Sequence, residues 1–463
     1  MRRKHLVVVV VTIFLCWNIM MYYVLVSKNP GKSISFEEKL TWLEADIQHE
    51  LKENTGLLEQ LRKLRQNAER QAKQKSRAAV EMDARQNMEA AIKRPNQHRT
   101  EAPVNLPART NKEPGVDANS VVLPILMIAC NRVTVSRSLD QLLKYRTSPE
   151  RFPIIVSQDC GHQATAEVIQ KYVASDNVIH IQQPDLSDIE LPWPKKKFSG
   201  YYKIARHYKW ALNQIFHHFN HSAVIIVEDD LDVSPDFFEY FAATYPILTS
   251  DPSLWCVSAW NDNGKNGMVS DEPELLYRSD FFPGLGWMME RKLWLEIGPK
   301  WPVTFWDDWM RHQDQRKDRV CIRPEICRTS TFGKKGVSLG LFYEKHLKHI
   351  KLNDKFVAFT QKDLSYLKKE NYDPWFKSMV YDTPEVTVAE VMSGSKKHLK
   401  ALRVTYTTKE QYKSIAKRLG IMDDFKAGVP RVAYRGVNSF IYSGQRIYLA
   451  PKSDWNQYDL TWT

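Results

Sequence analysis

The sequence of 463 residues predicts an α/β protein built around a mostly parallel β-sheet. From residue 121 onward, short apolar runs rich in valine and isoleucine alternate with longer segments of helical pattern. Apolar strands that alternate with helices are typical of a parallel sheet, because the crossover helices cover both of its faces. Hydrophobic residues make up 43% of the chain, which excludes a largely disordered protein.

The strands and helices of this sheet are assigned from their patterns. Four apolar runs are predicted to be strands and three segments between them helices: strands at 121–132, 152–159, 178–181 and 223–227, and helices at 138–145, 165–173 and 201–219. Beyond residue 345, the segments LRVTYTT, GVPRVAYRG and RIYLAP predict further strands. We therefore expect a second, smaller domain that contains its own sheet.

Charged side chains lie at the carboxyl ends of three of the predicted strands. Arg132 ends the first strand, Asp159 ends the second, and Glu228-Asp229-Asp230 follows the fourth. In open α/β sheets, ligands bind beyond the carboxyl ends of the strands, so these residues are expected to converge on one cleft. Neither GxGxxG nor GxxxxGK[ST] occurs, which argues against a dinucleotide cofactor and against P-loop ATP chemistry.

Three adjacent carboxylates at the end of an apolar strand repel one another unless a positive charge compensates them. A hard divalent cation would do so, and such ions also take oxygens from a diphosphate. Alternatively, Asp230 is a solvated helix N-cap, since Ser234 and Asp236 indicate that a helix begins nearby. The residues alone leave these two interpretations equally open.

Three further candidate residues also have ordinary structural interpretations. Arg132 could be a simple charge at a strand end, although a diphosphate ligand needs cationic neutralisation. Asp159 could serve as a turn residue. His207, in the segment IARHYKW, could be a packed histidine on a buried helix face.

The N-terminus predicts a membrane anchor. Three basic residues at positions 2–4 precede an apolar run at 6–26, long enough to span a bilayer core of roughly 30 Å. A cleaved signal peptide is the alternative, but the run lacks a small-residue cleavage site. Positive charge on the short N-terminal side predicts that the rest of the chain lies in a lumen or outside the cell.

A helical stem is predicted between this anchor and the sheet. Residues 36–64 carry a heptad pattern, which favours a parallel coiled coil and hence a homo-oligomer over a solitary solvated helix. Residues 95–118 hold four prolines and little periodicity, so they are expected to form a linker.

Charge and cysteine content narrow the function further. The net charge is +12, but no stripe of lysine and arginine interleaved with aromatics occurs in the body of the chain, so nucleic acid is not expected as a partner. The cysteines beyond the predicted anchor have no spacing typical of a zinc site: Cys130, Cys160, Cys256, Cys321 and Cys327. Five is an odd number, so at least one is free or pairs between chains.

A membrane-anchored luminal protein that handles a metal-bound diphosphate suggests a glycosyltransferase using a nucleotide sugar. The blocks ILMIACNR, FPIIVSQDCGH, GYYKIARHYKWAL, VEDDLDVSPDFFEYF, WCVSAWNDNGK, FFPGLGWM, FWDDWMR and RTSTFGKKGVS occur in this order. In these blocks the chain resembles the N-acetylglucosaminyltransferase I family over about residues 121–463.

The resemblance implies an inverting enzyme of GT-A fold in the Golgi membrane, with single-pass type II topology and a luminal catalytic domain. It implies UDP-GlcNAc as donor, Mn²⁺ as cofactor, and the terminal α1,3-linked mannose of the five-mannose N-glycan as acceptor. The expected organisation has five parts: a cytoplasmic tail at 1–5, the anchor at 6–26, the stem at 27–118, the GT-A domain at 119–345 and an α+β domain at 346–463.

The resemblance also implies roles for individual residues. Asp230 matches the metal ligand, and Asp307 in FWDDW matches the general base. The residues that match donor contacts are Arg132, Asp159, His207, Glu228, Asp229 and Ser338, the last in a loop that closes over the donor.

Two further expectations come with the resemblance. It supports disulfides Cys130–Cys160 and Cys256–Cys321, the first of which joins the ends of two predicted strands, and leaves Cys327 free. In one place the chain departs from the family, because the arginine pair that commonly follows WDDWM is here Arg311-His312. This departure could alter an ion pair but leaves the base in place.

Two rival functions remain. A related transferase that adds GlcNAc to O-linked mannose would share the donor site, but such proteins usually carry an extra luminal sugar-binding domain. A Golgi lectin that only binds glycans would need neither the three carboxylates at 228–230 nor Asp307.

Overall fold

In the computed structural model, the described residues are 121–334, 336–337 and 340–462. They belong to one compact unit, Asn111–Thr463. The predicted tail, anchor and stem lie outside the described residues. Within the described ranges, no helix combines the length and the apolar character that a membrane crossing requires.

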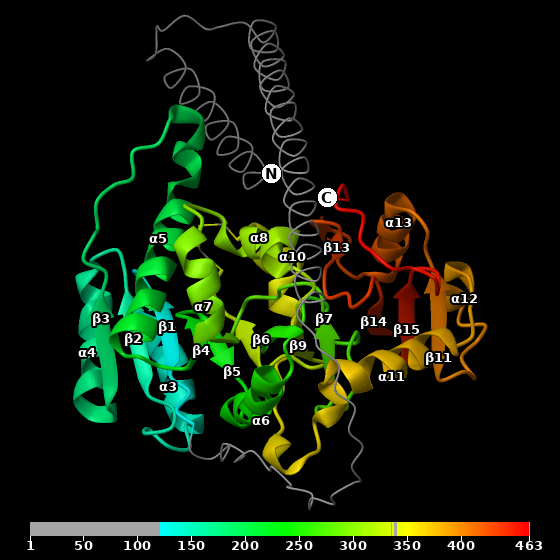
Figure 1. The fold of residues 1–463 in the computed structure, drawn as a ribbon, viewed down its shortest axis with the longest axis horizontal. Coiled ribbons are helices and arrows are strands. Elements are labelled where there is room, and N and C mark those ends of the chain that lie inside the picture. The colour runs from blue at the N-terminus through cyan, green and yellow to red at the C-terminus, as the bar shows by residue number, and fades with distance from the viewer. Residues whose placement is uncertain (1–120, 335, 338–339, 463) are drawn as a thin grey trace, which may run out of the picture. The chain divides into compact units, whose positions relative to one another are not determined.

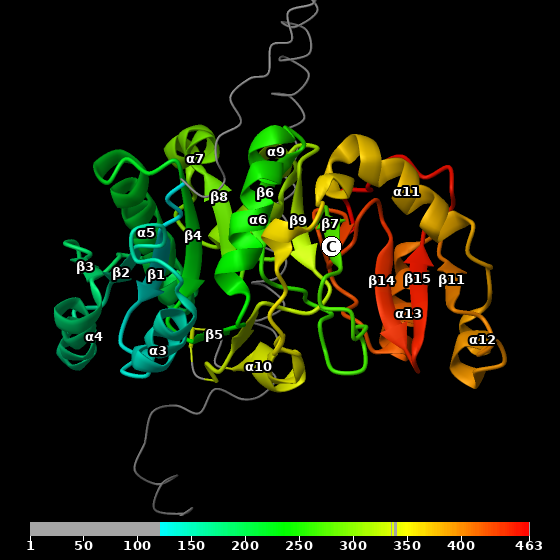
Figure 2. The ribbon, with the colours of Figure 1, turned by 90° about the horizontal axis from the view of Figure 1, so that it is seen from below.

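The main sheet has eight strands in the order β3-β2-β1-β4-β8-β6-β9-β7 (Figures 1 and 2). Its strands are β1 (Ile125–Ala129), β2 (Ile154–Gln158), β3 (Val178–Gln182), β4 (Ala223–Glu228), β6 (Leu254–Ser258), β7 (Leu276–Ser279), β8 (Trp287–Glu290) and β9 (Val320–Pro324). Strands β3, β2, β1 and β4 are mutually parallel, and β9 is parallel to β6. The prediction of a mostly parallel sheet is confirmed, whereas the antiparallel strands β8 and β7 were not predicted.

Helices cover both faces of this sheet. The α-helices of the described residues, some of which pack on the second sheet instead, are α3 (Val135–Tyr145), α4 (Gln163–Asp176), α5 (Ser199–Asn213), α6 (Phe237–Ser250), α7 (Arg291–Ile297), α8 (Trp306–Arg311), α9 (Gln313–Arg316), α10 (Leu341–Lys345), α11 (Lys369–Tyr381), α12 (Val388–Ser393) and α13 (Lys409–Leu419). The three predicted helices correspond to α3, α4 and α5. A π-helical turn at Gln214–His218 extends α5 to nearly the predicted end.

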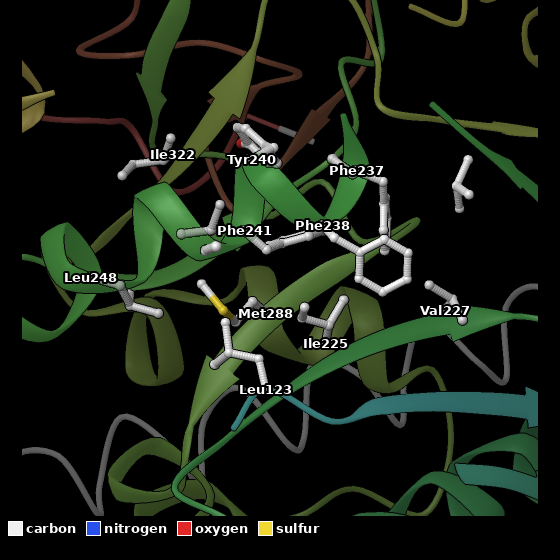
Figure 3. Packing of buried hydrophobic residues seen from close by; sticks show 14 of the residues in the cluster. Leu123, Ile225, Val227, Phe237, Phe238, Tyr240, Phe241, Leu248, Met288 and Ile322 are labelled. Carbon is white, nitrogen blue, oxygen red and sulfur yellow. The ribbon is translucent and has the colours of Figure 1, made fainter. Parts of the chain in front are cut away.

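Alternating side chains of the strands enter two separate cores. In β1, Ile125 and Met127 pack in the core that includes α3 and α6, while Leu126 packs in the core that includes α5 and α7. Figure 3 shows part of the first core, where Phe238 of α6 lies over Ile225 of β4. Two-sided burial explains why these strands are apolar at nearly every position.

A second sheet of three strands lies beyond the β7 edge of the main sheet (Figure 2). Its order is β11 (Ala401–Thr405), β15 (Gln445–Ala450) and β14 (Asn438–Tyr442), and together with α13 it forms a core of its own. Two of its strands were predicted as LRVTYTT and RIYLAP. The prediction of a strand over GVPRVAYRG was largely wrong.

In that segment only β13 (Val429–Pro430) is a strand, and it pairs with β12 (Phe425–Lys426). The backbone then turns, with positive φ angles of 71° at Val432 and 48° at Arg435. Such angles are incompatible with an extended strand.

A last pair of short strands, β5 (Leu231–Val233) and β10 (Thr329–Thr331), lies close to the end of β4.

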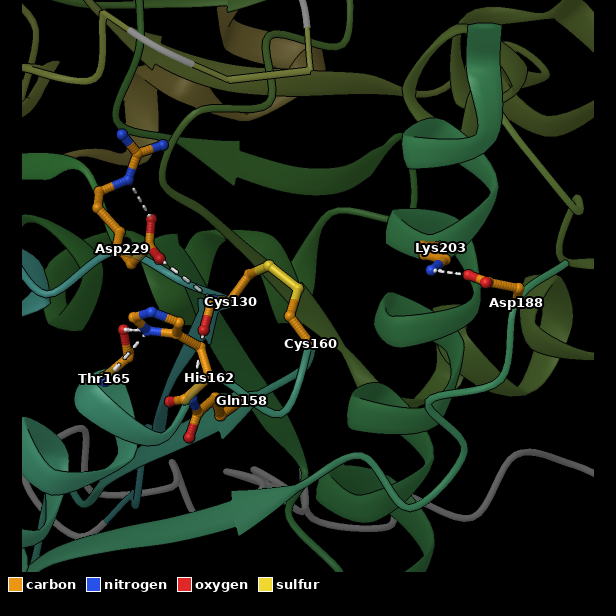
Figure 4. Close-up of a disulfide and its surroundings, with 9 residues drawn as sticks. Cys130, Gln158, Cys160, His162, Thr165, Asp188, Lys203 and Asp229 are labelled. Carbon is orange, nitrogen blue, oxygen red and sulfur yellow. Dashed lines mark hydrogen bonds and ion pairs between the residues drawn. A yellow bond between two sulfur atoms is a disulfide. The ribbon is translucent and has the colours of Figure 1, made fainter. Parts of the chain in front are cut away.

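Both expected disulfides are present. Cys130 and Cys160 follow the neighbouring parallel strands β1 and β2, and their Cα atoms are 5.2 Å apart (Figure 4). Cys256 and Cys321 lie opposite each other in β6 and β9, with a Cα separation of 4.7 Å. Cys327 is free and buried, as predicted. Burial raises the pKa of its thiol to about 12.

Candidate functional site

Three carboxylates end strand β4 and are called the β4 cluster: Glu228, Asp229 and Asp230. Glu228 is the last residue of the strand, and it accepts a 2.9 Å hydrogen bond from the hydroxyl of Tyr208 in α5. Burial raises the pKa of Glu228 to about 7, and the negative charge of Asp230 adds to the shift. The carboxylate therefore lies where its negative charge is poorly compensated.

Asp229 connects the ends of β4 and β1. One carboxylate oxygen accepts from Arg132 Nε at 3.0 Å, and the other accepts from the backbone N–H of Cys130 at 3.2 Å (Figure 4). Burial raises the pKa of Asp229, although the Arg132 charge and the Cys130 hydrogen bond oppose the shift. The Cys130–Cys160 disulfide thus lies directly beside this contact.

Asp230 lies between Arg132 and the chain that follows β10. Arg132 Nη2 is 3.2 Å from Asp230 Oδ2, and the Phe332 N–H donates to the backbone carbonyl of Asp230 at 2.9 Å. A β-carbon at position 333 would lie only 1.8 Å from Asp230 Oδ2. Gly333 is therefore needed at this close approach. Burial raises the pKa of Asp230 to about 6.

The β4 cluster fits a hard divalent cation. Its donors are carboxylate oxygens, which such ions prefer, and its raised pKa values indicate negative charge that Arg132 offsets only in part. In the described part of the chain, no group of three or more His, Cys, Asp or Glu side chains is arranged to hold a metal. A cation here would therefore take further ligands from a bound diphosphate or from water, as small divalent ions commonly do.

Asp159 and His207 lie at the same edge of the sheet. Asp159 follows β2, is buried, and donates its backbone N–H to the Ala129 carbonyl at 2.9 Å. His207 Nε2 is 2.7 Å from the hydroxyl oxygen of Ser157 in β2. Burial lowers the pKa of His207 to about 4, against the opposing charge of Asp159, so the imidazole is neutral near pH 7.

A second pair of carboxylates, the α8 pair, consists of Asp307 and Asp308. Arg311 Nη1, one turn later in the helix, is 2.7 Å from Asp307 Oδ2 and 2.9 Å from Asp308 Oδ1. Lys426 Nζ is 2.8 Å from the other oxygen of Asp308. Burial alone would raise the pKa of Asp308, but the hydrogen bond from Lys426 and the two positive charges lower it.

Glu228 of the β4 cluster and both members of the α8 pair line one cavity, called the central cavity. Its volume is about 490 Å³, and both Glu228 and Asp307 line it. Its walls contain aromatic residues and three residues from the C-terminal part of the chain: Tyr201, Tyr208, Trp287, Phe305, Trp306, Met422, Lys426 and Arg431. A ligand in this cavity could therefore contact a buried carboxylate on one side and a more exposed one on the other.

The structure brings together most of the site residues predicted from the sequence. Arg132 contacts Asp229 and Asp230 directly, whereas His207 contacts Ser157. Ser338 lies outside the described residues. His312, the departure from the family pattern, is exposed and precedes α9.

Sequence reasoning missed several side chains that hold the site. Tyr208 lies one residue from His207 on α5, and its hydrogen bond to Glu228 had no sequence signal. Arg311 could have been found, because it lies four residues after Asp307 in a predicted motif, the spacing of a helical ion pair. The Lys426–Asp308 contact spans 118 residues and could not have been found.

Comparisons with known proteins add to this geometry. The profile described as the GNT-I family matches residues 12–462. A protein of Arabidopsis thaliana named alpha-1,3-mannosyl-glycoprotein 2-beta-N-acetylglucosaminyltransferase is 40% identical over 331 residues, which cover 71% of this chain and 73% of that protein.

Similarity to solved structures is weak. A mannosyltransferase, PcManGT from Pyrobaculum calidifontis in complex with GDP-Man and Mn²⁺, matches with a TM-score of 0.28 and 13% identity over 39% of this chain and 48% of that chain. S. aureus TarS 1-349 in complex with UDP-GlcNAc matches with a TM-score of 0.26 and 15% identity, over 38% and 47% of the two chains. Each match thus spans about half the length of the solved chain.

Proposed function

The chain belongs to the GNT-I family, and we propose that it transfers N-acetylglucosamine from UDP-GlcNAc in β1,2 linkage to the terminal α1,3-linked mannose of the five-mannose N-glycan. Transfer of this kind starts the synthesis of hybrid and complex N-glycans. One observation carries the proposal. The central cavity brings Glu228 of the β4 cluster together with both carboxylates of the α8 pair, as a donor site next to a base for the acceptor would require.

The donor is proposed to bind at the carboxyl ends of β1, β2 and β4, in a sheet of GT-A type. Arg132 faces the β4 cluster and would also neutralise a diphosphate, for which a guanidinium is well suited. Asp159 is assigned to the uridine, and Glu228 and Asp229 to the sugar and ribose. His207 is neutral, so it would act as a hydrogen-bonding group rather than as a charge.

Manganese is proposed as the cofactor, with Asp230 as its protein ligand. The raised pKa of Asp230 supports this assignment, because a buried carboxylate gains most from a cation beside it. When bound, the ion would supply positive charge that offsets the negative charge on the departing diphosphate. Gly333 would keep the Asp230 carboxylate in place by leaving room for it.

Asp307 is proposed as the general base. Its carboxylate would accept the proton of the mannose 2-hydroxyl as that oxygen forms the bond to the anomeric carbon of GlcNAc. UDP leaves from the opposite face, so a single displacement inverts the anomeric configuration and needs no covalent intermediate. Arg311 holds one oxygen of Asp307, while Asp308 is shared between two cations and is the weaker base.

The cellular setting is also a proposal. We place the enzyme in the Golgi membrane through residues 6–26, with the stem at 27–118 and a possible coiled coil before the catalytic part. The two disulfides support a luminal location, because disulfides persist in oxidising compartments.

A transfer assay on the full chain tests the proposed function. UDP-GlcNAc and the free five-mannose glycan are supplied with manganese, and NMR identifies the linkage of the product. We expect a β1,2-linked GlcNAc on the α1,3-linked mannose and no product after chelation of the metal. Efficient transfer to O-linked mannose on a peptide, with none to the N-glycan, would favour the related transferase instead.

A further inference from the structure

A second cavity lies between the main sheet and the three-stranded sheet, and we call it the inter-sheet cavity. Its volume is about 570 Å³, within the range of roughly 300–1,000 Å³ typical of small-molecule sites. Its lining comes from β7, α11, β15 and the segments around them. It shares no lining residue with the central cavity.

Two buried tyrosines from the two sheets line this cavity. Tyr277 of β7 and Tyr448 of β15 are each 5% exposed. Within the described part of the chain neither hydroxyl forms a hydrogen bond, and neither is among the enclosed polar atoms without a partner, so both are accessible from the cavity. Both hydroxyls are therefore free to bond to a polar ligand there.

An aromatic surface accompanies the two hydroxyls. Trp375 of α11 lines the cavity and is 44% exposed. Tyr366 and the fully buried Tyr372 meet its ring edge-to-face, with centroid separations of 6.0 and 5.3 Å. The indole is therefore held in position before any ligand arrives.

Charges of both signs surround the cavity. Glu272, Glu274 and Asp363 contribute carboxylates, and Lys362 and Lys400 contribute ammonium groups. Arg446 also lines the cavity but is paired with Glu325 at 2.7 Å. A lining with charges of both signs does not favour a ligand of high net charge. A ligand with many hydroxyls can form hydrogen bonds with both the carboxylates and the ammonium groups.

We propose that the inter-sheet cavity binds a neutral oligosaccharide. The apolar C–H face of one sugar ring would lie on Trp375, and its hydroxyls would supply partners to Tyr277 and Tyr448. This inference rests on the proposed function, because the proposed function determines which glycan would supply the sugar. That source is either another branch of the acceptor glycan or a second glycan on the same glycoprotein.

Binding of the free five-mannose oligosaccharide to the full chain tests the proposal. Wild type is compared with Trp375→Ala, which removes the ring, and with Tyr448→Phe, which removes one hydroxyl and keeps the packing. Trp193→Ala is the matched control, because Trp193 is 78% exposed and lines neither cavity. Calorimetry is expected to give two sites in wild type and in the control. Trp375→Ala should weaken one site by about tenfold or more.

Kinetics distinguish the two sources. Every variant should transfer GlcNAc to a short α1,3-linked dimannoside with unchanged kcat, which verifies an intact fold and active site. A KM for the five-mannose glycan that rises in Trp375→Ala assigns the cavity to the same glycan. A KM that rises only for a glycoprotein with two glycans assigns it to the second one.

Identical binding isotherms for wild type, Trp375→Ala and Tyr448→Phe would overturn the inference. This result would leave the proposed function intact if transfer to the dimannoside persists. Conversely, the protein could bind the oligosaccharide in a way that depends on Trp375 and yet transfer no GlcNAc. That result would support oligosaccharide binding in the inter-sheet cavity and reject the proposed function.

Discussion

The β4 cluster and the α8 pair use the same chemical group in opposite surroundings. Asp229 and Asp230 have side chains only 11% and 15% exposed, whereas Asp307 and Asp308 are 45% and 36% exposed. In the β4 cluster burial raises the pKa values. In the α8 pair, Arg311 contacts both carboxylates and Lys426 contacts Asp308.

The different surroundings suit the two groups of carboxylates to two different functions. Buried carboxylates with too little positive charge attract a cation and the diphosphate that comes with it. A more exposed carboxylate, held at one oxygen only, can meet an acceptor hydroxyl. Substitutions in each group of carboxylates test this division.

Loss of Asp230 should have the largest effect. Asp230→Ala removes the proposed metal ligand and with it the anchor of the diphosphate, so transfer should fall to background even at saturating manganese. A radiochemical transfer assay measures the loss, and thermal unfolding verifies the fold. Wild-type turnover in this variant would refute the assignment of the β4 cluster.

Loss of the proposed base should leave donor binding and remove turnover. Asp307→Asn keeps the shape of the side chain but removes the proton acceptor, so kcat should fall by roughly 10²–10⁴-fold. Asp308→Asn is the matched control and should lower kcat less, because Asp308 is already shared between Arg311 and Lys426. If Asp308→Asn abolishes turnover while Asp307→Asn stays active, the base has been assigned to the wrong member of the α8 pair.

A substitution of Gly333 tests whether manganese binding depends on the position of the Asp230 carboxylate as well as on its charge. In Gly333→Ala the new β-carbon collides with Asp230 Oδ2, so the carboxylate or the chain after β10 must move. We expect manganese affinity, measured by electron paramagnetic resonance, to weaken by about tenfold, with a smaller loss of stability.

Gly336→Ala is the control for this effect. Among the described residues, no atom lies within 4 Å of a β-carbon at position 336. This variant should bind manganese as wild type does. Equal affinities in both variants would show that the contact with Gly333 does not position Asp230.

His207 shows the consequence of burial for a base. Its folded pKa of about 4 lies below the ordinary value of 6.5, so the unfolded state binds more protons between these values. The free energy of unfolding should therefore fall as pH decreases from 6.5 to 4, by up to about 3 kcal/mol from this residue.

Denaturant unfolding of His207→Gln across this pH range measures that contribution. Glutamine does not titrate here, so the variant should lose less stability on acidification than wild type does. Identical pH dependence in the two proteins would show that the imidazole does not stay neutral in the folded state.

The β4 cluster was better predictable from the sequence than the α8 pair. Strands β1, β2 and β4 are buried on both faces, so their apolar runs and the charges at their ends are visible in the sequence. The role proposed for Asp307 came from a family resemblance, and its surroundings depend on tertiary contacts. Lys426, which distinguishes Asp308 from Asp307, lies on β12, beyond any local pattern.

The parts of the fold that escaped prediction have a similar explanation. Strand β8 pairs antiparallel between β4 and β6, and β7 pairs antiparallel with β9. Both have only four residues, too few to establish a period or a direction. In GVPRVAYRG the apolar residues suggested a strand, but the positive φ angles of Val432 and Arg435 bend the chain there.

Donor affinity in two variants tests the division of roles most directly. Binding of UDP-GlcNAc to full-length Asp307→Asn and Asp230→Ala is measured by calorimetry in the presence of manganese. We expect near-wild-type affinity for Asp307→Asn and no detectable manganese-dependent binding for Asp230→Ala. Loss of donor binding in Asp307→Asn, or its retention in Asp230→Ala, would contradict the assignment of the β4 cluster to the donor and the α8 pair to the acceptor.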